Sequence, residues 1–361
     1  MNPISSLHIG ILTGGGDCPG LNAVVRAVTL NLLKHTRARI TGIEKGFYGL
    51  IARKVRPLTE ASVTQILHEG GSILGAHNSA NPFRWSGAQG ADVSGEVIAF
   101  ARELGLDALV VIGGDGTMAI ANRIHQMGLP VVGVPKTIDN DLMHTERTFG
   151  FDSAVAVVAD SLQRLETTAR SHDRVMILET MGRYAGWIAL EGGIAGGAHA
   201  IVLPELPYDP ETLANLCRQR QHDEGYTLIC IAEGAKPKGG DMVIKEHLAH
   251  SPDPIRLGGV GDALRLQLQQ RLDCEVRSMQ LGHLQRGGSP TAFDCVLSTQ
   301  FGWWAAEMVK QQAFGRMVVL QNNQCSSVPL NEVAGKIRHV PLDHPLVRTA
   351  RSIGVSFGAE L

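Results

Sequence analysis

Short apolar runs that recur along the chain constrain its fold more than any other feature of the sequence. Each run is rich in Val, Ile and Leu and is bounded by glycine, proline or a polar turn. Continuous apolar runs this short are typical of strands that are buried on both faces, as in a parallel sheet. We therefore predict strands at Leu7–Leu12, Ala108–Ile112, Val131–Val134, Val175–Leu178, Ala200–Leu203, Leu228–Ile231 and Met317–Leu320.

Stretches with helical periodicity lie between these runs. They predict helices at Asn22–Leu33, Val93–Leu104, Ala154–Thr168 and Asp262–Leu272. Strands that alternate with helices in this way indicate an α/β fold with doubly wound sheets. The length of 361 residues suggests two domains, at roughly 150 residues each. The segment Lys236–Gly261, rich in Gly and Pro, is predicted to be a surface loop.

The composition excludes several functional classes. The 33 basic and 35 acidic side chains leave a net charge of −2, so the chain lacks the positive excess of a general nucleic-acid or anionic-membrane binder. No apolar run reaches the ~18 residues of a membrane-spanning helix, and no signal peptide precedes the first predicted strand. The six cysteines are scattered without a CxxC pair, which favours reduced thiols over a zinc site or a disulfide framework. We expect a cytoplasmic protein that binds neither nucleic acid nor membrane.

Glycine-rich loops follow two of the predicted strands. Thr13–Asn22 reads TGGGDCPGLN, Gly113–Thr117 reads GGDGT, and each loop opens a helix. Glycine lets backbone N–H groups approach an anion closely, and a helix N-terminus adds favourable partial charge. Because ligands of doubly wound sheets bind beyond the carboxyl ends of the strands, both loops are candidate phosphate sites. Asp115, held between glycines, is a candidate Mg²⁺ contact. An ordinary strand-to-helix turn is the alternative interpretation of the first loop.

A pair of carboxylates follows the strand predicted at Val131–Val134, in the segment PKTIDND. Asp139 and Asp141 are two residues apart, so in an extended segment they project to the same side. One could take a proton from a hydroxyl group while the other supports a metal ion or its water. A solvated acidic loop is the alternative interpretation.

Basic and polar residues also follow the later strands. Arginine is suited to bidentate recognition of phosphate, so several arginines at strand ends beside glycines favour an anionic sugar or a nucleotide as ligand. A single histidine among them is more often structural. The residues in question are Met181, Gly182, Arg183, Glu233, Arg277, His283 and Arg286.

Together these motifs resemble the phosphofructokinase family, in the branch whose members use either ATP or pyrophosphate. GGDGT, PKTIDND, SHDRVMILETMGR, EG and LGHLQRGGSP occur in this order between about Ile9 and Pro290. The combination is specific, whereas GGDG alone also occurs in NAD kinases and diacylglycerol kinases. The resemblance implies an α/β fold with two doubly wound, mainly parallel sheets and an active site in the cleft between two domains. It implies a donor-binding domain at 1–150 plus 285–335 and a sugar-phosphate-binding domain at 151–284 plus 336–361.

The resemblance also implies a role for each candidate residue. Asp139 is the base that deprotonates the 1-hydroxyl of fructose 6-phosphate, and Asp115 holds Mg²⁺. Arg174 and Arg277 match arginines that reach the sugar phosphate from a neighbouring subunit, so we expect a homo-oligomer, dimer or tetramer, with shared sites. The donor phosphates are assigned to Gly15, Gly114, Asp115, Gly116, Thr117 and Lys136. The sugar phosphate is assigned to Thr137, Asp141, Arg174, Met181, Gly182, Arg183, Glu233, Arg277, His283 and Arg286.

Two residues of the predicted donor site favour different phosphoryl donors. In the family, pyrophosphate users generally carry Asp where this chain has Gly116, and strictly ATP-dependent members carry Gly where it has Lys136. A carboxylate at position 116 crowds and repels the α-phosphate of ATP, so Gly116 favours ATP. An arginine that often faces the donor phosphates is missing here before Arg84. We expect ATP as the donor, with reversible transfer from pyrophosphate as the alternative.

Two more distant interpretations stay open. An NAD-kinase-like enzyme shares the GGDG motif, but it leaves Arg183 and the RGGSP segment without a role. A catalytically silent nucleotide-binding regulator does not need both Asp115 and Asp139. The main expectation is therefore a glycolytic transferase that phosphorylates fructose 6-phosphate to fructose 1,6-bisphosphate.

Overall fold

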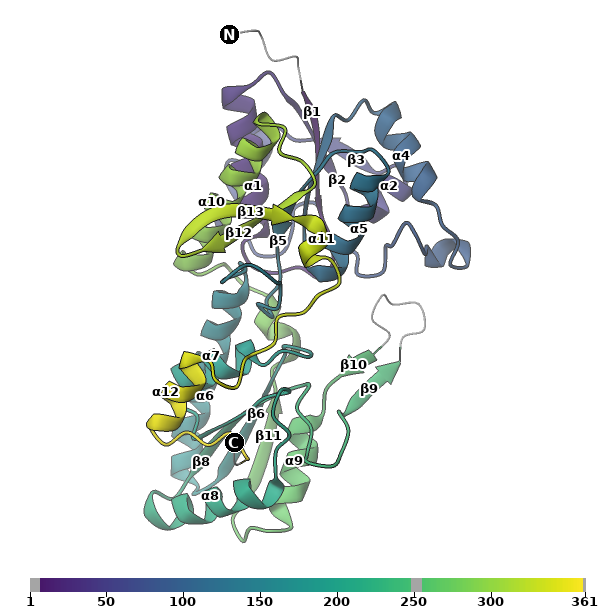
Figure 1. Cartoon of the computed structure of the whole chain (residues 1–361). Helices are drawn as coiled ribbons and strands as arrows, with labels where there is room; N and C mark the ends of the chain where they lie inside the picture. The colour runs from purple at the N-terminus through teal and green to yellow at the C-terminus, as the bar shows by residue number, and fades with distance from the viewer. Residues whose placement is uncertain (1–6, 248–254, 360–361) are drawn as a thin grey trace.

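The computed structural model describes residues 7–247 and 255–359 and folds them into two α/β bodies (Figure 1). The first body is built on a seven-stranded sheet. All its neighbouring strands pair in parallel except at the two edges, where β3 and β13 run antiparallel. The strand order is β13 (Gln324–Pro329), β12 (Arg316–Gln321), β5 (Val131–Pro135), β4 (Ala108–Gly113), β1 (His8–Thr13), β2 (Arg39–Ile43) and β3 (Val55–Pro57).

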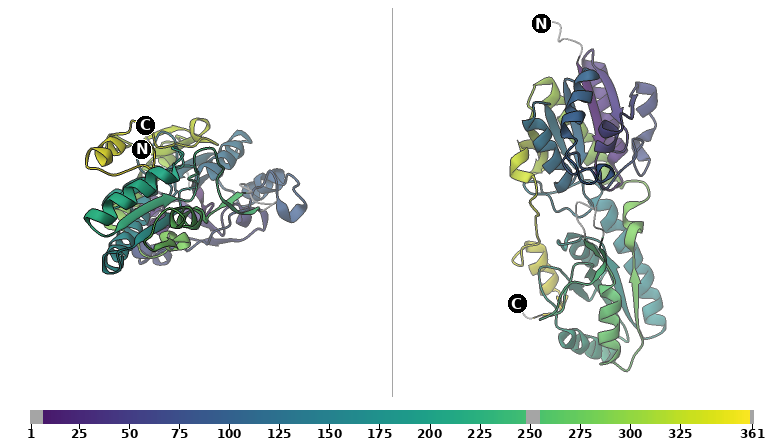
Figure 2. Two further views of the ribbon diagram at one scale, coloured as in Figure 1. Left: turned by 90° about the horizontal axis from the view of Figure 1, so that it is seen from below. Right: turned by 90° about the vertical axis from the view of Figure 1, so that its right-hand side faces the viewer.

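The second body is built on a four-stranded sheet that is parallel throughout. Its order is β11 (Val276–Gln280), β6 (Val175–Thr180), β8 (Thr227–Ala232) and β7 (Ala200–Val202). All seven strands predicted from apolar runs are present, and the prediction of an α/β fold with two mainly parallel sheets is confirmed. Figure 2 shows the two bodies stacked along the long axis of the molecule, with the C-terminal segment beside both.

Helices cover both faces of the large sheet, which explains why its central strands β1, β4 and β5 are fully buried. Alternate residues of one strand enter different cores: Val110 and Ile112 face one hydrophobic cluster, and Leu109 and Val111 face another. This is the two-residue period of a strand buried on both sides. The helices of this body are α1 (Leu21–His35), α2 (Phe47–Ile51), α3 (Glu60–Val63), α4 (Ser94–Glu103), α5 (Asp115–Gln126), α10 (Ala292–Lys310) and α11 (Leu330–Val333), with the 3-10 turns η1 (Ile66–His68) and η2 (Ser86–Ala88).

The second body carries five helices around its smaller sheet in the described part of the chain. The predicted helices at Ala154–Thr168 and Asp262–Leu272 correspond to α6 and α9, with ends that differ by up to three residues. The bounds are α6 (Phe151–Ser171), α7 (Trp187–Ala195), α8 (Pro210–Asp223), α9 (Val260–Gln269) and α12 (Pro345–Ser352), with the 3-10 turn η3 (Gly282–Arg286).

The prediction of a surface loop at Lys236–Gly261 is wrong in part. The segment contains an antiparallel hairpin of β9 (Ile244–His247) and β10 (Ile255–Leu257), and α9 begins within it at Val260. The hairpin projects from the second body (Figure 1), and β10 is only half-buried. It therefore lacks the continuous apolar run by which buried strands are recognised. Residues 248–254 of the segment lie outside the described residues.

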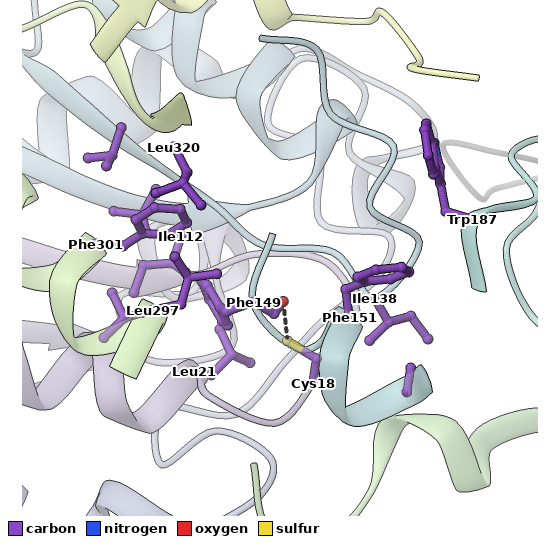
Figure 3. Packing of buried hydrophobic residues seen from close by; sticks show 14 of the residues in the cluster. Cys18, Leu21, Ile112, Ile138, Phe149, Phe151, Trp187, Leu297, Phe301 and Leu320 are labelled. Atoms are coloured by element: carbon purple, nitrogen blue, oxygen red, sulfur yellow. Dashed lines mark hydrogen bonds between the residues drawn. The ribbon is translucent and has the colours of Figure 1, made fainter. Parts of the chain in front are cut away.

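One hydrophobic cluster continues from the first body into the second. Ile138, Phe149 and Phe151 lie in the connection between the two sheets, and Figure 3 shows them beside Cys18, whose thiol donates to the carbonyl oxygen of Phe149 at 3.8 Å. The two bodies thus share a core at the point where the chain passes between them. The residue boundaries proposed for the domains stay a prediction. No helix among the described residues is long and apolar enough to cross a membrane.

Candidate active site

The two glycine-rich loops lie side by side because the strands before them are neighbours. β1 has β2 on one side and β4 on the other, the change of direction at which doubly wound sheets bind ligands. Thr117 packs between the loops. A β-carbon on Gly14 would lie 2.6 Å from its Cγ2, and a β-carbon on Gly113 would lie 2.3 Å from the same atom. Because only glycine fits at these two positions, the close approach of the loops depends on them.

Both loops end at helix N-termini that are open to a ligand. α1 follows Gly20 and α5 follows Gly114, and within the described chain neither N-terminus has a side-chain cap. Free N–H groups and the positive end of the helix dipole favour a bound anion. A β-carbon on Gly15 would lie 3.6 Å from the hydroxyl of Thr117. The predicted donor residues on β1 and β4 therefore meet at one place, which is suited to phosphate.

Two cations flank the first glycine loop. The Lys136 ammonium group is buried and donates to the carbonyl oxygen of Gly16 at 2.5 Å. Arg286 comes from the second body and donates from Nη1 to the carbonyl oxygen of Asp17 at 3.2 Å. Burial lowers the pKa of Lys136, and the charge of Arg286 lowers it too. Both side chains favour an anion near the loop. Lys136, predicted for the donor site, lies on the Gly15–Gly16 side, and Arg286, predicted for the sugar phosphate, also contacts this loop.

The segment after β5 turns instead of continuing as a strand, which corrects the expectation of an extended segment. Asn140 has a φ of 51°, a left-handed conformation that Asn tolerates better than most residues. The turn is held by hydrogen bonds: the Thr137 hydroxyl accepts from the Asp139 N–H at 3.0 Å, and the side-chain oxygen of Asn140 accepts from the Thr148 N–H at 3.0 Å. The orientations of Asp139 and Asp141 therefore depend on the Asn140 turn.

The turn brings together carboxylates that repel one another. Asp139 is 6% exposed, and its Oδ1 has no hydrogen-bond partner among the described residues. Burial, followed by the charges of Asp139 and Asp115, raises the pKa of Asp141 to about 7. Burial, followed by the charge of Asp139, raises the pKa of Glu233 to about 7. Asp139 is therefore the common neighbour of carboxylates from both bodies.

The carboxylates suit a magnesium ion that also binds substrate. Mg²⁺ is usually held by one or two protein carboxylates together with phosphate oxygens and water. Asp115 stands at the N-terminus of α5, half-buried beside the phosphate loop, and its charge acts on Asp141. A divalent cation would relieve this repulsion. The residues present fit the predicted ion, with Asp115 as its protein contact.

Three loops of the second body, which follow β6, β8 and β11, meet at the carboxyl ends of these strands. The backbone N–H of Arg183 donates to Glu233 Oε1 at 3.1 Å, which joins the loop after β6 to the loop after β8. A β-carbon on Gly234 would lie 1.8 Å from the Arg183 carbonyl oxygen, so this approach requires glycine. The N–H of Met181 donates to the side-chain oxygen of Gln285 on η3 at 3.3 Å. The predicted residues Met181–Arg183, Glu233 and Arg286 thus lie on loops that follow β6, β8 and β11, and the charge of Asp139 acts on Glu233.

Arg174 and Arg277 do not join this group. Both form ion pairs with Glu275, Arg174 just before β6 and Arg277 near the start of β11. They lie at the amino ends of strands whose carboxyl ends carry the loops described above, a strand length of roughly 17 Å away. His283, on η3, is exposed. Within one chain the predicted sugar-phosphate residues therefore fall into two groups.

The structure also shows residues at the site that sequence reasoning did not identify. Gln285 is fully buried and joins η3 to the loop after β6. Arg338 donates from Nη2 to the carbonyl oxygen of Asn140 at 2.7 Å. Gln285 lies inside the LGHLQRGGSP motif and could have been found there. Arg338 is 198 residues from Asn140 in the sequence, in a segment without a motif, so no local signal identified it.

Comparisons with known proteins agree with this geometry. The phosphofructokinase family model matches residues 8–309. The chain is 46% identical over 365 residues to the ATP-dependent 6-phosphofructokinase 2 of Clostridium perfringens, which covers 99% of each chain. It is 42% identical over 353 residues to a pyrophosphate–fructose 6-phosphate 1-phosphotransferase of Streptomyces coelicolor, covering 98% of this chain and 100% of that protein.

Solved structures add the same fold at lower sequence identity. The pyrophosphate-dependent phosphofructokinase of Marinobacter aquaeolei superposes with a TM-score of 0.81 at 22% identity, over 97% of this chain and 92% of that one. A phosphofructokinase of Pichia pastoris has a TM-score of 0.79 at 29% identity, over 91% of this chain and 35% of that one. The family model matches well over half of the chain, and the two curated relatives cover 98–99% of it. This chain belongs to the phosphofructokinase family.

Proposed function

We propose that this chain is a 6-phosphofructokinase that transfers the γ-phosphoryl group of ATP to O1 of fructose 6-phosphate and yields fructose 1,6-bisphosphate. The observation that carries the proposal is the buried Asp139 carboxylate, which has an unpaired oxygen and whose charge acts on Lys136 beside the phosphate loop and on Glu233 of the other body. Relatives at 45–46% identity that are named ATP-dependent 6-phosphofructokinases support it. The reaction is a kinase step of glycolysis.

Phosphoryl transfer requires little covalent catalysis from the protein. Phosphoryl transfer needs alignment of the two oxygens and neutralisation of charge on the transferred group. Asp139 accepts the proton of the sugar hydroxyl through Oδ1, a buried oxygen that has no hydrogen-bond partner among the described residues. The N-termini of α1 and α5 bind donor oxygens, while Arg183 and Arg286 bind the sugar phosphate. Asp115 would hold a Mg²⁺ ion at the N-terminus of α5, and the ion would supply charge neutralisation at the donor phosphates.

Space at position 116 supports ATP as the donor. Gly116 is the second residue of α5 and is exposed, and no described atom lies within 4 Å of a β-carbon built on it. A nucleotide that extends beyond the β-phosphate has room there. Pyrophosphate is the second candidate donor, because the buried ammonium group of Lys136 beside Gly15 and Gly16 suits a small, highly charged donor.

We further propose that the enzyme is cytoplasmic and that its sugar-phosphate sites are shared between subunits. Arg174 and Arg277 lie at the amino end of the second sheet, where they can complete a sugar-phosphate site only in another subunit, so a homo-oligomer is proposed. The six cysteines are free thiols in the described structure, which supports a reducing compartment.

The test is a direct assay of the purified protein. Fructose 6-phosphate and Mg²⁺ are mixed with either ATP or pyrophosphate, and fructose 1,6-bisphosphate is measured with a coupled enzyme. We expect turnover with ATP. Asp139→Asn should reduce kcat by roughly 10²–10⁴-fold because it removes the proton acceptor, while the exposed Asp241→Asn serves as the matched control. Product formation from NAD instead of the sugar, or no product with either donor, would contradict the proposal.

A further inference from the structure

The segment Lys336–His344, here named the strap, is the third connection between the two bodies, after those from β5 to α6 and from η3 to α10. It leaves α11 in the first body and enters α12 in the second (Figure 1). Ile337 forms an isolated antiparallel bridge with Leu142, directly after the acidic turn at 139–141. The strap therefore runs alongside the residue that follows the Asn140 turn before it reaches the second body.

Arg338 is the residue of the strap that holds this turn. Its backbone N–H donates to the carbonyl oxygen of Asp141 at 2.7 Å. Its guanidinium group donates to the carbonyl oxygen of Asn140 from Nη2 at 2.7 Å and from Nε at 3.2 Å, and to that of Glu146 at 3.3 Å. The carbonyl oxygen of Asn140 thus receives two charge-assisted hydrogen bonds. These bonds fix the one left-handed peptide between Asp139 and Asp141.

The guanidinium group is itself fixed by the second body. It lies 4.4 Å from the centroid of the Trp187 ring, and the Trp187 Nε1–H donates to the carbonyl oxygen of Arg338 at 2.9 Å. Trp187 is the first residue of α7, and Figure 3 shows it across from Ile138 of the acidic turn. Glu205 accepts from both Val340 of the strap, at 2.8 Å, and Gly186 before α7, at 3.0 Å.

This chain of contacts runs from α7 through Arg338 to the peptide beside the proposed base. We propose that Arg338 is a positioning residue: it sets the orientation of Asp139 relative to the sugar hydroxyl by holding the Asn140 peptide against the second body, which carries the sugar phosphate. This inference rests on the proposed function. Because misplacing a catalytic group by about 1 Å can cost 10²-fold in rate, a residue that only holds the turn affects turnover more than affinity.

The variants are chosen to separate positioning from folding. Arg338→Met keeps a long stem against Trp187 but removes every guanidinium hydrogen bond, and Arg338→Lys keeps the charge with a single donor group. Arg351→Met is the matched control, because Arg351 also lies in the C-terminal segment over an aromatic ring, at 5.2 Å from the centroid of Phe357, in α12. Steady-state kcat and KM for both substrates are measured for each variant, together with its Tm.

For Arg338→Met we expect kcat to fall by ~10–100-fold, since two charge-assisted bonds to one carbonyl are lost. KM for fructose 6-phosphate and for the donor should change by less than about threefold. Arg338→Lys should lower kcat by about 3–10-fold, because it keeps the charge but only one of the donor nitrogens. If Arg338→Met does not fold, the kcat of Arg338→Lys is the value that tests the inference. Guanidinium at millimolar concentration should raise the kcat of Arg338→Met and leave that of Arg351→Met unchanged.

Two results would overturn the inference. One is a folded Arg338→Met enzyme whose kcat is within twofold of that of the unmodified enzyme. The same conclusion follows if Arg351→Met lowers kcat as much as Arg338→Met does. The other is a rise in KM with unchanged kcat, which would mean that Arg338 supports binding alone. The activity of the unmodified enzyme decides the proposed function separately, because the inference concerns only ratios between variants that turn over.

Discussion

Replacing Gly116 with aspartate tests the choice of donor at a position of the predicted donor site where the structure leaves space. Gly116 is the second residue of α5, and a side chain there meets no described atom within 4 Å of its β-carbon. Aspartate in the first turn of a helix is stabilised by the dipole by about 0.3–1 kcal/mol, and the loss of glycine adds a few tenths more. Gly116→Asp should therefore fold at least as stably as the unmodified protein.

The expected penalty on ATP comes from charge. A carboxylate about 5 Å from a nucleotide phosphate at an effective dielectric constant of about 20 gives a repulsion of roughly 3 kcal/mol. A differential of ~2–4 kcal/mol corresponds to about 30- to 1,000-fold in kcat/KM. Pyrophosphate has no α-phosphate, so it should lose far less. The ratio of kcat/KM for ATP to kcat/KM for pyrophosphate should fall by that factor.

The assay measures kcat/KM with both donors for the unmodified enzyme, Gly116→Asp and a control. Gly95→Asp is the matched control, because Gly95 is also the second residue of a helix, α4, with no described atom within 4 Å of its β-carbon. It lies outside the predicted site and should leave the donor ratio unchanged. Equal losses with ATP and pyrophosphate in Gly116→Asp, in a protein of normal Tm, would refute the reasoning. So would an unmodified enzyme that uses pyrophosphate and not ATP.

Further predictions concern Lys136, the two remote arginines and a buried aspartate. Lys136→Met, which removes the ammonium group beside the Gly15–Gly16 loop, should reduce kcat/KM for pyrophosphate by ~10-fold more than for ATP; a larger effect on ATP would reverse the assignment. Arg174→Ala and Arg277→Ala should raise KM for fructose 6-phosphate by ~10-fold or more, and mixing either with Asp139→Asn should restore activity in reassorted oligomers. Burial raises the pKa of Asp294 from its ordinary 3.8 to about 6. The protonated side chain therefore contributes fully to the free energy of unfolding below pH ~4, and this contribution, about 3 kcal/mol, is lost as the pH rises through 6. Asp294→Asn should lack this slope in urea unfolding between these pH values, and an unchanged slope would exclude Asp294 as its source.

Most of the buried strands could be predicted because burial on both faces leaves a trace in the sequence. β2, which is buried at four of its five residues, was not predicted. β4 and β5 are fully buried and continuously apolar. β11 was not predicted, although it lies in the same kind of sheet, because it is an edge strand with exposed residues such as Arg277 and Met279. β13 is likewise an edge strand and has no fully buried residue. Edge strands contact a neighbour on one side only, so their pattern is weaker.

The candidate site likewise has features that the sequence predicts and features that it does not. Its glycine and acidic motifs follow strands directly, so strand positions alone were enough to predict that they meet at one edge. The conformation at Asn140 was not predictable from spacing, because a left-handed residue replaced the expected extended backbone. The contact of Arg338 with that turn joins residues 198 positions apart, and it exists only after the two bodies have packed together.

The cost of the buried carboxylates is the physical reason to assign chemistry to this edge. Burying a charged group without a partner is strongly unfavourable, and proteins usually pair such groups. Glu179 follows this rule, since it is buried but accepts N–H bonds from Gly259 and Gly261. Asp139 does not, because one of its oxygens stays unpaired among the described residues while its charge raises the pKa values of Asp141 and Glu233. Asp294 and Glu205 also bury an unpaired oxygen, so the free oxygen alone does not mark the proton acceptor. Asp139 is distinguished by its charge, which acts on two further carboxylates of the site, and we therefore assign the proton acceptor to Asp139.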